Sequence, residues 1–281
     1  MKKLIRLFSV LGLLLCFTAC SGSKETTITV AASELPHAKI LNEIVKDILK
    51  EKGYELEVTV LDWTMQNDAV ANGEYDANYF QHIPYLETYT GKVKLAAVAK
   101  VHYEKLCAYA KDVNHKVLQN GDKIVMVDDI SNAERALNLL VEQGIITIKD
   151  SSYVDGVFTN FDASNPLKSV EFTENYKGCT LTCIPEALLC QSLNDYDFGI
   201  IPGNTALTGL GTNFSERISF GESNNEELID AKANIIAVKE ENLNSPKTKA
   251  LVEALSDSRV KTYIENTFGD SVLYHYVDLT K

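Results

Sequence analysis

One side chain suited to chemistry in this sequence is an arginine near a predicted helix start. Arg135 follows Ser131 and precedes the rest of an apolar helical stripe, and Ser131 and Glu134 have the spacing of a helix-capping box. A guanidinium can hold a carboxylate through two parallel hydrogen bonds, and the unpaired N–H groups of a first helical turn add donors. Arg135 is therefore a candidate for binding an α-carboxylate. The alternative is a solvated surface arginine that pairs with Glu134 or Asp128.

A dense group of rings is the second candidate feature. The segment YFQHIPYLET, residues 79–88, carries Tyr79, Phe80, His82, Pro84 and Tyr85. Phe80 and Tyr85, together with Trp63, can form the wall around a flexible thioether, because sulfur packs favourably near aromatic edges. Trp63 and Tyr85 also stand at predicted strand-to-helix junctions, where open α/β sheets bind ligands. The alternative for each ring is an ordinary place in the hydrophobic core.

Histidine and asparagine side chains supply further polar candidates. His82 could act as a base, a metal ligand or a hydrogen-bond donor, and the absence of a second ligand or carboxylate pattern favours the donor role. His37 and His102 are expected to be structural. Asn204 and Asn234 lie beside predicted strands, where an amide can accept from an ammonium and donate to a carboxylate. The alternative, strongest for Asn204, is a turn residue beside glycine.

The sequence lacks the motifs of the common catalytic sites. It has no G-x-S-x-G, no H-E-x-x-H and no glycine-rich phosphate loop. We therefore expect no catalytic residue and no cofactor in this chain, and we expect any ATP hydrolysis to belong to a partner.

The elements that must position these residues follow an α/β order. Alternating or apolar segments predict strands, and apolar stripes at helical spacing predict helices. Strands are predicted at 26–33, 56–62, 75–80, 123–129, 197–204 and 233–240, and helices from Pro36, near Gln66, after Ser131 and from Pro246 to about Phe268. Crossover-length links between the first three strands predict a parallel sheet.

This order predicts two lobes. We expect residues 26–110 and 232–281 to form the first lobe and residues 111–231 the second. The chain would cross between them near 105–112 and again near 204–238. Lobes joined by two crossings form a hinge, and ligands bind in the cleft between them.

The N-terminus reads as a processing signal. A basic start with Lys2, Lys3 and Arg6 precedes a short apolar run, which ends in the sequence FTAC at Cys20. This pattern predicts a lipoprotein signal peptide at 1–19, a diacyl anchor on the Cys20 thiol and a polar tether at 20–25. The alternatives are an ordinary secretory peptide or an N-terminal anchor helix.

Charge and cysteine content exclude some classes of partner and site. The chain carries a net charge of −12, and removal of the three cations in the predicted leader gives −15, so nucleic acid and anionic lipid are poor partners for its surface. The cysteines that remain beyond Cys20 are Cys107, Cys179, Cys183 and Cys190. Their spacing lacks the paired C-x2-C knuckles of a structural zinc site, so we expect no metal site. In an exported protein two of these cysteines could form a disulfide, and the sequence does not say which two.

Several stretches together resemble the methionine-binding lipoproteins of ABC importers, the NlpA-type family. These stretches are PHAKIL, DWTMQNDAVANGEYDANYFQHIPYLETY, VAKVHYE, SNAERALNLL, PGNTALTGL and ANIIAVKEEN, and the likeness runs from about residue 28 to 268. The resemblance implies a two-lobed, type II periplasmic-binding fold that closes on L-methionine. It also implies delivery to a membrane permease with a cytoplasmic ATPase, from a lipid-anchored position on the extracytoplasmic side of the cell membrane.

The resemblance also implies a set of ligand-binding residues. They are Trp63, Phe80, His82, Tyr85, Asn132, Arg135, Asn204 and Asn234. The chain departs from the family at Pro202, where members often have an asparagine that offers a polar contact to the ligand.

That departure keeps other ligands open. The same class of protein could bind another apolar amino acid, D-methionine or a methionine dipeptide. Two remoter alternatives are a surface-anchored hydrolase or metal protein that uses His82 and the cysteines, and a lipoprotein that acts as an adhesin or scaffold.

Overall fold

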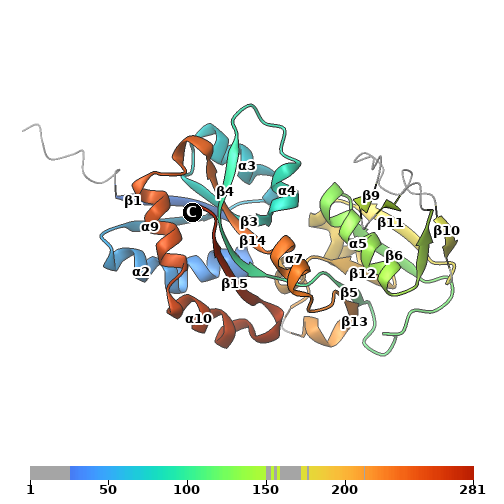
Figure 1. Cartoon of the computed structure of the whole chain (residues 1–281). Coiled ribbons are helices and arrows are strands. Elements are labelled where there is room, and N and C mark those ends of the chain that lie inside the picture. Colours follow the sequence, from blue (N-terminus) through green and yellow to red (C-terminus); the bar gives the residue numbers. More distant parts are fainter. Residues whose placement is uncertain (1–25, 150–152, 155–156, 159–171, 176, 212) are drawn as a thin grey trace, which may run out of the picture.

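The computed structural model describes residues 26–149, 153–154, 157–158, 172–175, 177–211 and 213–281. The predicted signal peptide, the tether and Cys20 therefore lie outside the described residues. The larger sheets of the described part are two mixed sheets, which Figure 1 shows in separate halves of the molecule. We call each sheet with its covering helices a lobe.

The first sheet holds six strands in the order β15-β4-β14-β3-β1-β2. Their bounds are β1 Thr27–Ala32, β2 Glu55–Val60, β3 Ala77–His82, β4 Leu95–Tyr103, β14 Asn234–Lys239 and β15 Leu273–Asp278. β1 pairs in parallel with β2 and β3, as predicted. The other three strands join antiparallel, because β14 returns from the second lobe and begins beside the last residue of β3.

The second sheet holds five strands in the order β11-β6-β12-β5-β13. Their bounds are β5 Cys107–Ala110, β6 Lys123–Val127, β11 Thr180–Ile184, β12 Phe198–Ile201 and β13 Ile218–Gly221. β6 runs parallel to β11 and β12, and β5 runs antiparallel to β12 and β13. Two short pairs lie apart from it, β7 Ile146–Ile148 with β10 Phe172–Asn175 and β8 Tyr153–Val154 with β9 Val157–Phe158.

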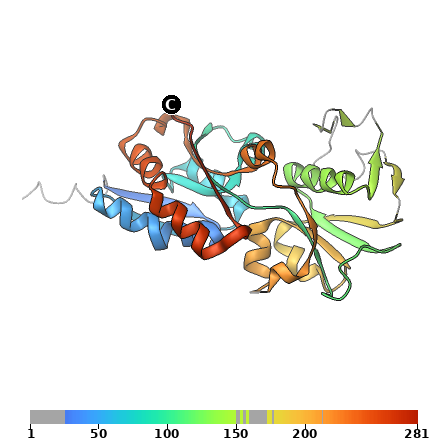
Figure 2. The same ribbon diagram turned by 60° about the horizontal axis from the view of Figure 1, so that its bottom comes forward.

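Helices cover both faces of the first sheet. The helices of this lobe are η1 Glu34–Ala38, η2 Leu41–Val45, α2 Lys46–Glu51, α3 Trp63–Asn72, α4 Ile83–Glu87, η5 Glu240–Asn242, α9 Pro246–Leu255, α10 Ser258–Phe268 and η6 Gly269–Ser271. Figure 2 shows α9, α10 and the helical residues 36–51 on one side of this sheet. α3 packs against β1 and β3 on the opposite side.

The helices of the rest of the chain are shorter, apart from α5. They are α5 Ile130–Glu142, η3 Glu186–Leu188, α6 Leu189–Ser192, α7 Gly203–Gly209, η4 Phe214–Arg217 and α8 Glu226–Lys232. The predicted helical tail from Pro246 is divided into α9 and α10. α9 ends at Leu255 with Ser256 as its C-cap, and Asp257 caps α10 by accepting a hydrogen bond from the Arg259 backbone N–H.

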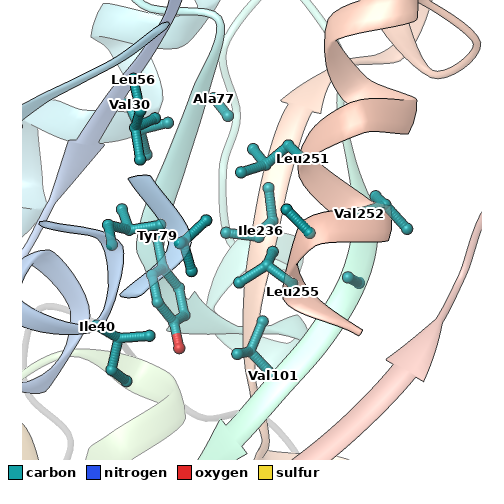
Figure 3. Packing of buried hydrophobic residues seen from close by; sticks show 14 of the residues in the cluster. Val30, Ile40, Leu56, Ala77, Tyr79, Val101, Ile236, Leu251, Val252 and Leu255 are labelled. Carbon is teal, nitrogen blue, oxygen red and sulfur yellow. The ribbon is translucent and has the colours of Figure 1, made fainter. Parts of the chain in front are cut away.

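The core of the first lobe fixes the orientation of β3, the strand that carries most of the aromatic segment. Figure 3 shows the Tyr79 ring among buried aliphatic side chains of this core, which include Val101 and Leu255. A β-bulge follows in the pairing with β14, where Ile235 and Ile236 oppose Gln81 and Tyr79 and leave Phe80 as the extra residue. Successive side chains of a strand point to opposite faces, so Tyr79 faces the core while Phe80 and His82 lie on the other face, at the end of the strand.

The crossings between the sheets are short. β4 ends at Tyr103 in the first sheet and β5 begins at Cys107 in the second. The predicted lobe boundary at residue 110 would therefore assign β5 to the first lobe, although it belongs to the second sheet. We therefore place the first crossing at 104–106. The second runs from 222 to 233 and includes α8, which packs on α4 and β4 of the first lobe. The predicted end of the second lobe at residue 231 falls inside this helix.

In the part of the chain that the structure describes, no helix combines the length and the apolar character that crossing a membrane requires.

Candidate functional site

All eight predicted ligand-binding residues line one pocket between the lobes, which we call the interlobe pocket. Its full lining is Trp63, Phe80, Gln81, His82, Tyr85, Glu104, Asn132, Arg135, Pro202, Gly203, Asn204 and Asn234. It measures about 360 Å3, counting the part open to solvent. Residues from β3, α3, α4 and β14 of the first lobe face α5 and α7 of the second, so the predicted location between two lobes is observed.

Three rings form the apolar wall of this pocket. Trp63 is the first residue of α3, whose start is capped by Asp62 through a hydrogen bond of 2.9 Å from the Thr64 N–H. Trp63 stacks on Tyr85 with 5.7 Å between ring centroids, and Phe80 meets Tyr85 edge-on at 5.6 Å. Trp63 and Tyr85 thus lie at strand-to-helix junctions, as the sequence predicts.

His82 links the two lobes. Its Nδ1 accepts a hydrogen bond of 3.2 Å from the Tyr85 backbone N–H and so caps α4. Burial, with Arg135 nearby, lowers the pKa of His82 to about 3, so the ring is neutral at physiological pH. We therefore assign its proton to Nε2, which donates to Asn132 Oδ1 at 3.2 Å. The Asn132 amide in turn donates to Asp129, so both side chains are engaged within the protein.

The start of α5 differs from the predicted capping box. Asp129, not Ser131, is the N-cap, and its carboxylate accepts from the Asn132 N–H at 3.0 Å and the Ser131 hydroxyl at 2.9 Å. The reason is that the helix begins at Ile130, which makes Ser131 its second helical residue. Arg135 therefore belongs to the second turn of α5, where its side chain is buried.

Arg135 holds a carboxylate, but one that belongs to the protein. Its Nε and Nη2 each lie 2.5 Å from an oxygen of Glu222, and Nη2 also donates to the Glu104 carbonyl at 2.8 Å. The guanidinium lies 5.6 Å from the centre of the Tyr103 ring. The surface pairing with Glu134 or Asp128 is thus replaced by a buried pair. Nη1 is not used in these three hydrogen bonds, and the Tyr103 hydroxyl also interacts with the guanidinium.

Glu222 ties this pair to the hinge. Its carboxylate also accepts from the Tyr103 hydroxyl at 2.7 Å and from the Leu106 N–H at 2.8 Å. Its own N–H donates to the Leu106 carbonyl at 3.1 Å, so the two crossings are joined side by side. Burial raises the pKa of Glu222, but the Arg135 charge and hydrogen bonds outweigh burial and leave this pKa below its usual value. Sequence analysis missed Glu222, because 87 residues separate it from Arg135.

The two asparagines differ in what they can still bind. Asn234 opens β14, and its Oδ1 lies 3.0 Å from His37 Nε2. Burial lowers the pKa of His37 to about 4, so this neutral ring donates from Nε2 and the amide NH2 of Asn234 is left as a donor. Asn204 is the second residue of α7, and its Oδ1 lies 3.5 Å from the Thr205 hydroxyl.

A buried carboxylate that sequence analysis also missed lines the same pocket. Glu104 Oε1 lies 2.5 Å from His102 Nε2, and His102 Nδ1 hydrogen-bonds the Tyr79 hydroxyl. Burial lowers the pKa of His102 to about 3, so we assign a neutral ring that accepts from Tyr79 and donates to Glu104. Both ring nitrogens of His102 are thus engaged, which agrees with the expected structural role.

This group also has the composition of a metal site. Ligand atoms of His37, His102 and Glu104 lie within 4.8 Å of one another. However, the 2.5 Å contact between His102 and Glu104 is a hydrogen-bond distance, and His37 Nε2 is engaged by Asn234. The donor set therefore fits a hydrogen-bonded network better than an ion. The four cysteines within the described residues, Cys107, Cys179, Cys183 and Cys190, are free thiols.

Comparison with known proteins agrees with this geometry. The family model described as NlpA lipoprotein matches residues 28–275. The chain belongs to the NlpA lipoprotein family. It is 35% identical to the methionine-binding lipoprotein MetQ of Bacillus subtilis over 260 residues. This alignment covers 90% of the present chain and 89% of that protein.

Solved structures of the family share the fold. A lipoprotein from Bacillus subtilis superposes with a TM-score of 0.78 at 33% identity, over 91% of this chain and 100% of that one. A nutrient-binding protein from Burkholderia cenocepacia, solved bound to methionine, gives 0.76 at 27% identity, over 88% and 99% of the two chains. This NlpA family member therefore has the predicted type II periplasmic-binding fold, in a family of substrate-binding transport proteins.

The buried pair generates a prediction about stability and pH. Glu222→Gln should lower the free energy of unfolding by about 3–5 kcal/mol at pH 7, because it leaves a buried guanidinium without its counter-charge. The folded-state pKa of Glu222 is depressed, so its contribution is present above the unfolded value of about 4.3 and is lost as the pH falls through the folded value. The gap between the two proteins should therefore shrink on acidification.

Urea unfolding followed by circular dichroism at pH 7 and at several lower pH values measures this gap. Glu265→Gln is the matched control, because Glu265 is 56% exposed on α10, and we expect a change within about 0.5 kcal/mol. A gap for Glu222→Gln that stays constant down to acid pH would contradict the assigned ionisation.

Proposed function

We propose that this protein is a lipid-anchored solute-binding protein that captures L-methionine and delivers it to the permease of an ABC importer. The observation that carries the proposal is the convergence of all eight predicted residues on the interlobe pocket. Three rings on one side and hydrogen-bonding groups on the other match an amino acid with an apolar side chain.

The two ends of the ligand would bind to different parts of the pocket. The thioether would pack against Trp63, Phe80 and Tyr85, since sulfur is attracted to the edges of aromatic rings. The α-carboxylate would accept from Arg135 Nη1 and from the amide NH2 of Asn234, donors that the hydrogen bonds with Glu222 and His37 do not use.

Binding would act on the relation between the lobes. The hydrogen bond between His82 and Asn132 joins β3 of the first lobe to α5 of the second, and it forms when the lobes are close. A ligand held by both lobes favours that arrangement and shifts the open–closed equilibrium by its difference in affinity for the two states. The permease would then receive the closed, loaded protein, and no covalent step is needed.

The location follows from the N-terminus. We infer cleavage before Cys20 and a diacyl anchor on its thiol, with the short tether leaving the lobes on the extracytoplasmic side of the cell membrane. Support comes from the family, whose members are named lipoproteins.

Direct binding measurements test the proposed ligand. Isothermal titration of the protein, freed of bound ligand by partial unfolding and refolding, should give one site for L-methionine with a dissociation constant in the micromolar range or below, about −8 kcal/mol or stronger. Absence of both heat and thermal shift at millimolar L-methionine would defeat the proposal.

The same titration separates the alternatives that Pro202 keeps open. Pro202 offers neither a side-chain polar group nor an N–H to the pocket, and its carbonyl accepts from the Ala206 N–H. D-methionine, leucine and methionine dipeptides are therefore titrated in competition with L-methionine. Stronger displacement by any of these would assign the site to that ligand within the same class of protein.

Removal of one ring tests the apolar wall. Trp63→Ala should weaken methionine binding by about tenfold or more, because a stacked indole is lost from the wall while the partly exposed position tolerates the change. Tyr89→Ala is the matched control, since Tyr89 lines the neighbouring groove rather than the interlobe pocket. Equal affinities for the two variants in isothermal titration would show that the ring does not contact the ligand.

The anchor has its own test. Cys20→Ser should move the protein from the membrane fraction to the soluble extracytoplasmic fraction, because no thiol remains for acylation. Fractionation and immunoblotting of cells that express both forms measure the change, and methionine binding by the purified variant serves as the control. Equal incorporation of labelled palmitate by Cys20→Ser and by the unaltered protein would contradict lipidation at this residue.

A further inference from the structure

Most hydrogen-bond acceptors of the interlobe pocket are already occupied by the protein. Asn132 Oδ1 accepts from His82, Asn234 Oδ1 accepts from His37, and His82 Nδ1 accepts from a backbone N–H. Gln81 Oε1 accepts from the Asn67 amide at 3.0 Å. These groups can offer donors to a ligand but have little capacity left to receive the three N–H donors of an ammonium.

Two lining residues of the described chain differ from these. Asn204 Oδ1 has one contact, at 3.5 Å from the Thr205 hydroxyl, but it is uncharged, whereas Glu104 carries a carboxylate. The Glu104 carboxylate is 4% exposed, and its Oε1 lies 2.5 Å from His102 Nε2 and 3.9 Å from Nε2 of the neutral His37 ring. A carboxylate has about four lone-pair sites. A backbone hydrogen bond from Asn204 still leaves acceptor capacity at this carboxylate. Burial raises the pKa of Glu104, although the Asn204 hydrogen bond and the Arg135 charge oppose that rise.

The charges around the pocket favour a cation at this point. Glu104 and Arg135 are the charged side chains of its lining, and His82 is neutral. The charge of Arg135 is compensated by Glu222 at 2.5 Å. Arg135 also acts on Glu104 through its charge, but the hydrogen-bonded partner of that charge is Glu222. Lys232 acts on His82, and the carboxylates of Asp129, Asp62 and Glu186 act on Tyr85, so the other charges near the lining are mostly negative.

The surrounding structure holds Glu104 in place. The chain from the Tyr79 hydroxyl through His102 fixes one carboxylate oxygen from the first lobe. From the second lobe, Gly203 of α7 comes so close that a Cβ on it would lie 2.7 Å from the Glu104 Cβ and 3.3 Å from Oε2. Glycine at this position permits the close approach, and the carboxylate lies at the first crossing between the lobes.

We propose that Glu104 binds the ligand's ammonium group and so makes a free amine the chief requirement for binding at this site. The proposal rests on the proposed function and assigns its specificity. Arg135, already paired with Glu222, then contributes less to recognition than its charge suggests, so loss of the ligand's ammonium costs more affinity than loss of its carboxylate charge.

Ligands that differ in one charged group test this order in the unaltered protein. Relative to L-methionine, 4-(methylthio)butanoate lacks the ammonium and L-methioninamide lacks the carboxylate charge. We expect the first to bind about 100-fold or more weakly, because it leaves a buried carboxylate unpaired, and the second to lose less. Equal or stronger binding of 4-(methylthio)butanoate relative to L-methioninamide would overturn the proposal.

A variant then assigns the effect to one residue. Glu104→Gln keeps the shape of the side chain and removes its charge. The affinity for L-methionine should therefore fall about 100-fold, while the affinity for 4-(methylthio)butanoate should change less than about threefold. Glu104→Asp keeps the charge and should retain the preference for L-methionine. Equal weakening of both ligands by Glu104→Gln would show a role in shape alone, and unchanged affinity for L-methionine would exclude any role.

Controls separate this proposal from the proposed function. Glu186→Gln removes a half-buried carboxylate from the neighbouring pocket, which shares Trp63 and Asn204 with the interlobe pocket. This variant should change the affinities for L-methionine and for 4-(methylthio)butanoate by less than about threefold. Thermal unfolding without ligand shows whether each variant is folded. If Glu104→Gln is unfolded, the comparison of ligands in the unaltered protein tests the proposal instead. Failure of every amino acid and dipeptide to bind would refute the proposed function, whereas methionine binding without a preference for the ammonium refutes the role of Glu104 alone.

Discussion

The buried ion pair between Arg135 and Glu222 is the interaction on which the arrangement of the lobes depends. Arg135 comes from α5 of the second lobe, and Glu222 lies where the chain leaves the second sheet. The same carboxylate accepts from Tyr103 and from the Leu106 backbone at the first crossing. One desolvated pair thus connects a helix with both hinge segments, and breaking it would leave a buried charge unpaired.

This constraint changes the role of the arginine in the pocket. A guanidinium that is already bound to a carboxylate offers a ligand the remaining Nη1 and little net charge. Similar commitments hold for His82, Asn132 and Asn234, whose hydrogen bonds inside the protein set which of their atoms still face the ligand. The pocket is preorganised in this way, since the protein and not the ligand orients its polar groups. Among the described lining residues, Glu104 is a carboxylate whose neighbouring cation, Arg135, is already paired with Glu222.

Much of the fold could be predicted from the sequence because local patterns are strong. The strand at Thr27–Ala32, the helix that ends before Gly53 and the strand at Phe198–Ile201 all follow from apolar periodicity and turn residues. Local pattern failed where two caps compete: Asp129 starts the helix that Ser131 was expected to cap. It also gave no information on the antiparallel strands of the first sheet, because strand direction there depends on the path of the chain through the other lobe.

The sequence by itself determined the family, the two-lobed class and the eight residues that meet in the interlobe pocket, because the family's motifs carry those residues at recognisable positions. The tertiary structure alone decided what each of them can still bind. Glu222 and Glu104 are far in sequence from Arg135, and no local spacing links a carboxylate to a guanidinium 87 positions away. Burial and neighbouring groups then set their ionisation, and these are properties of the packed chain rather than of the residue types.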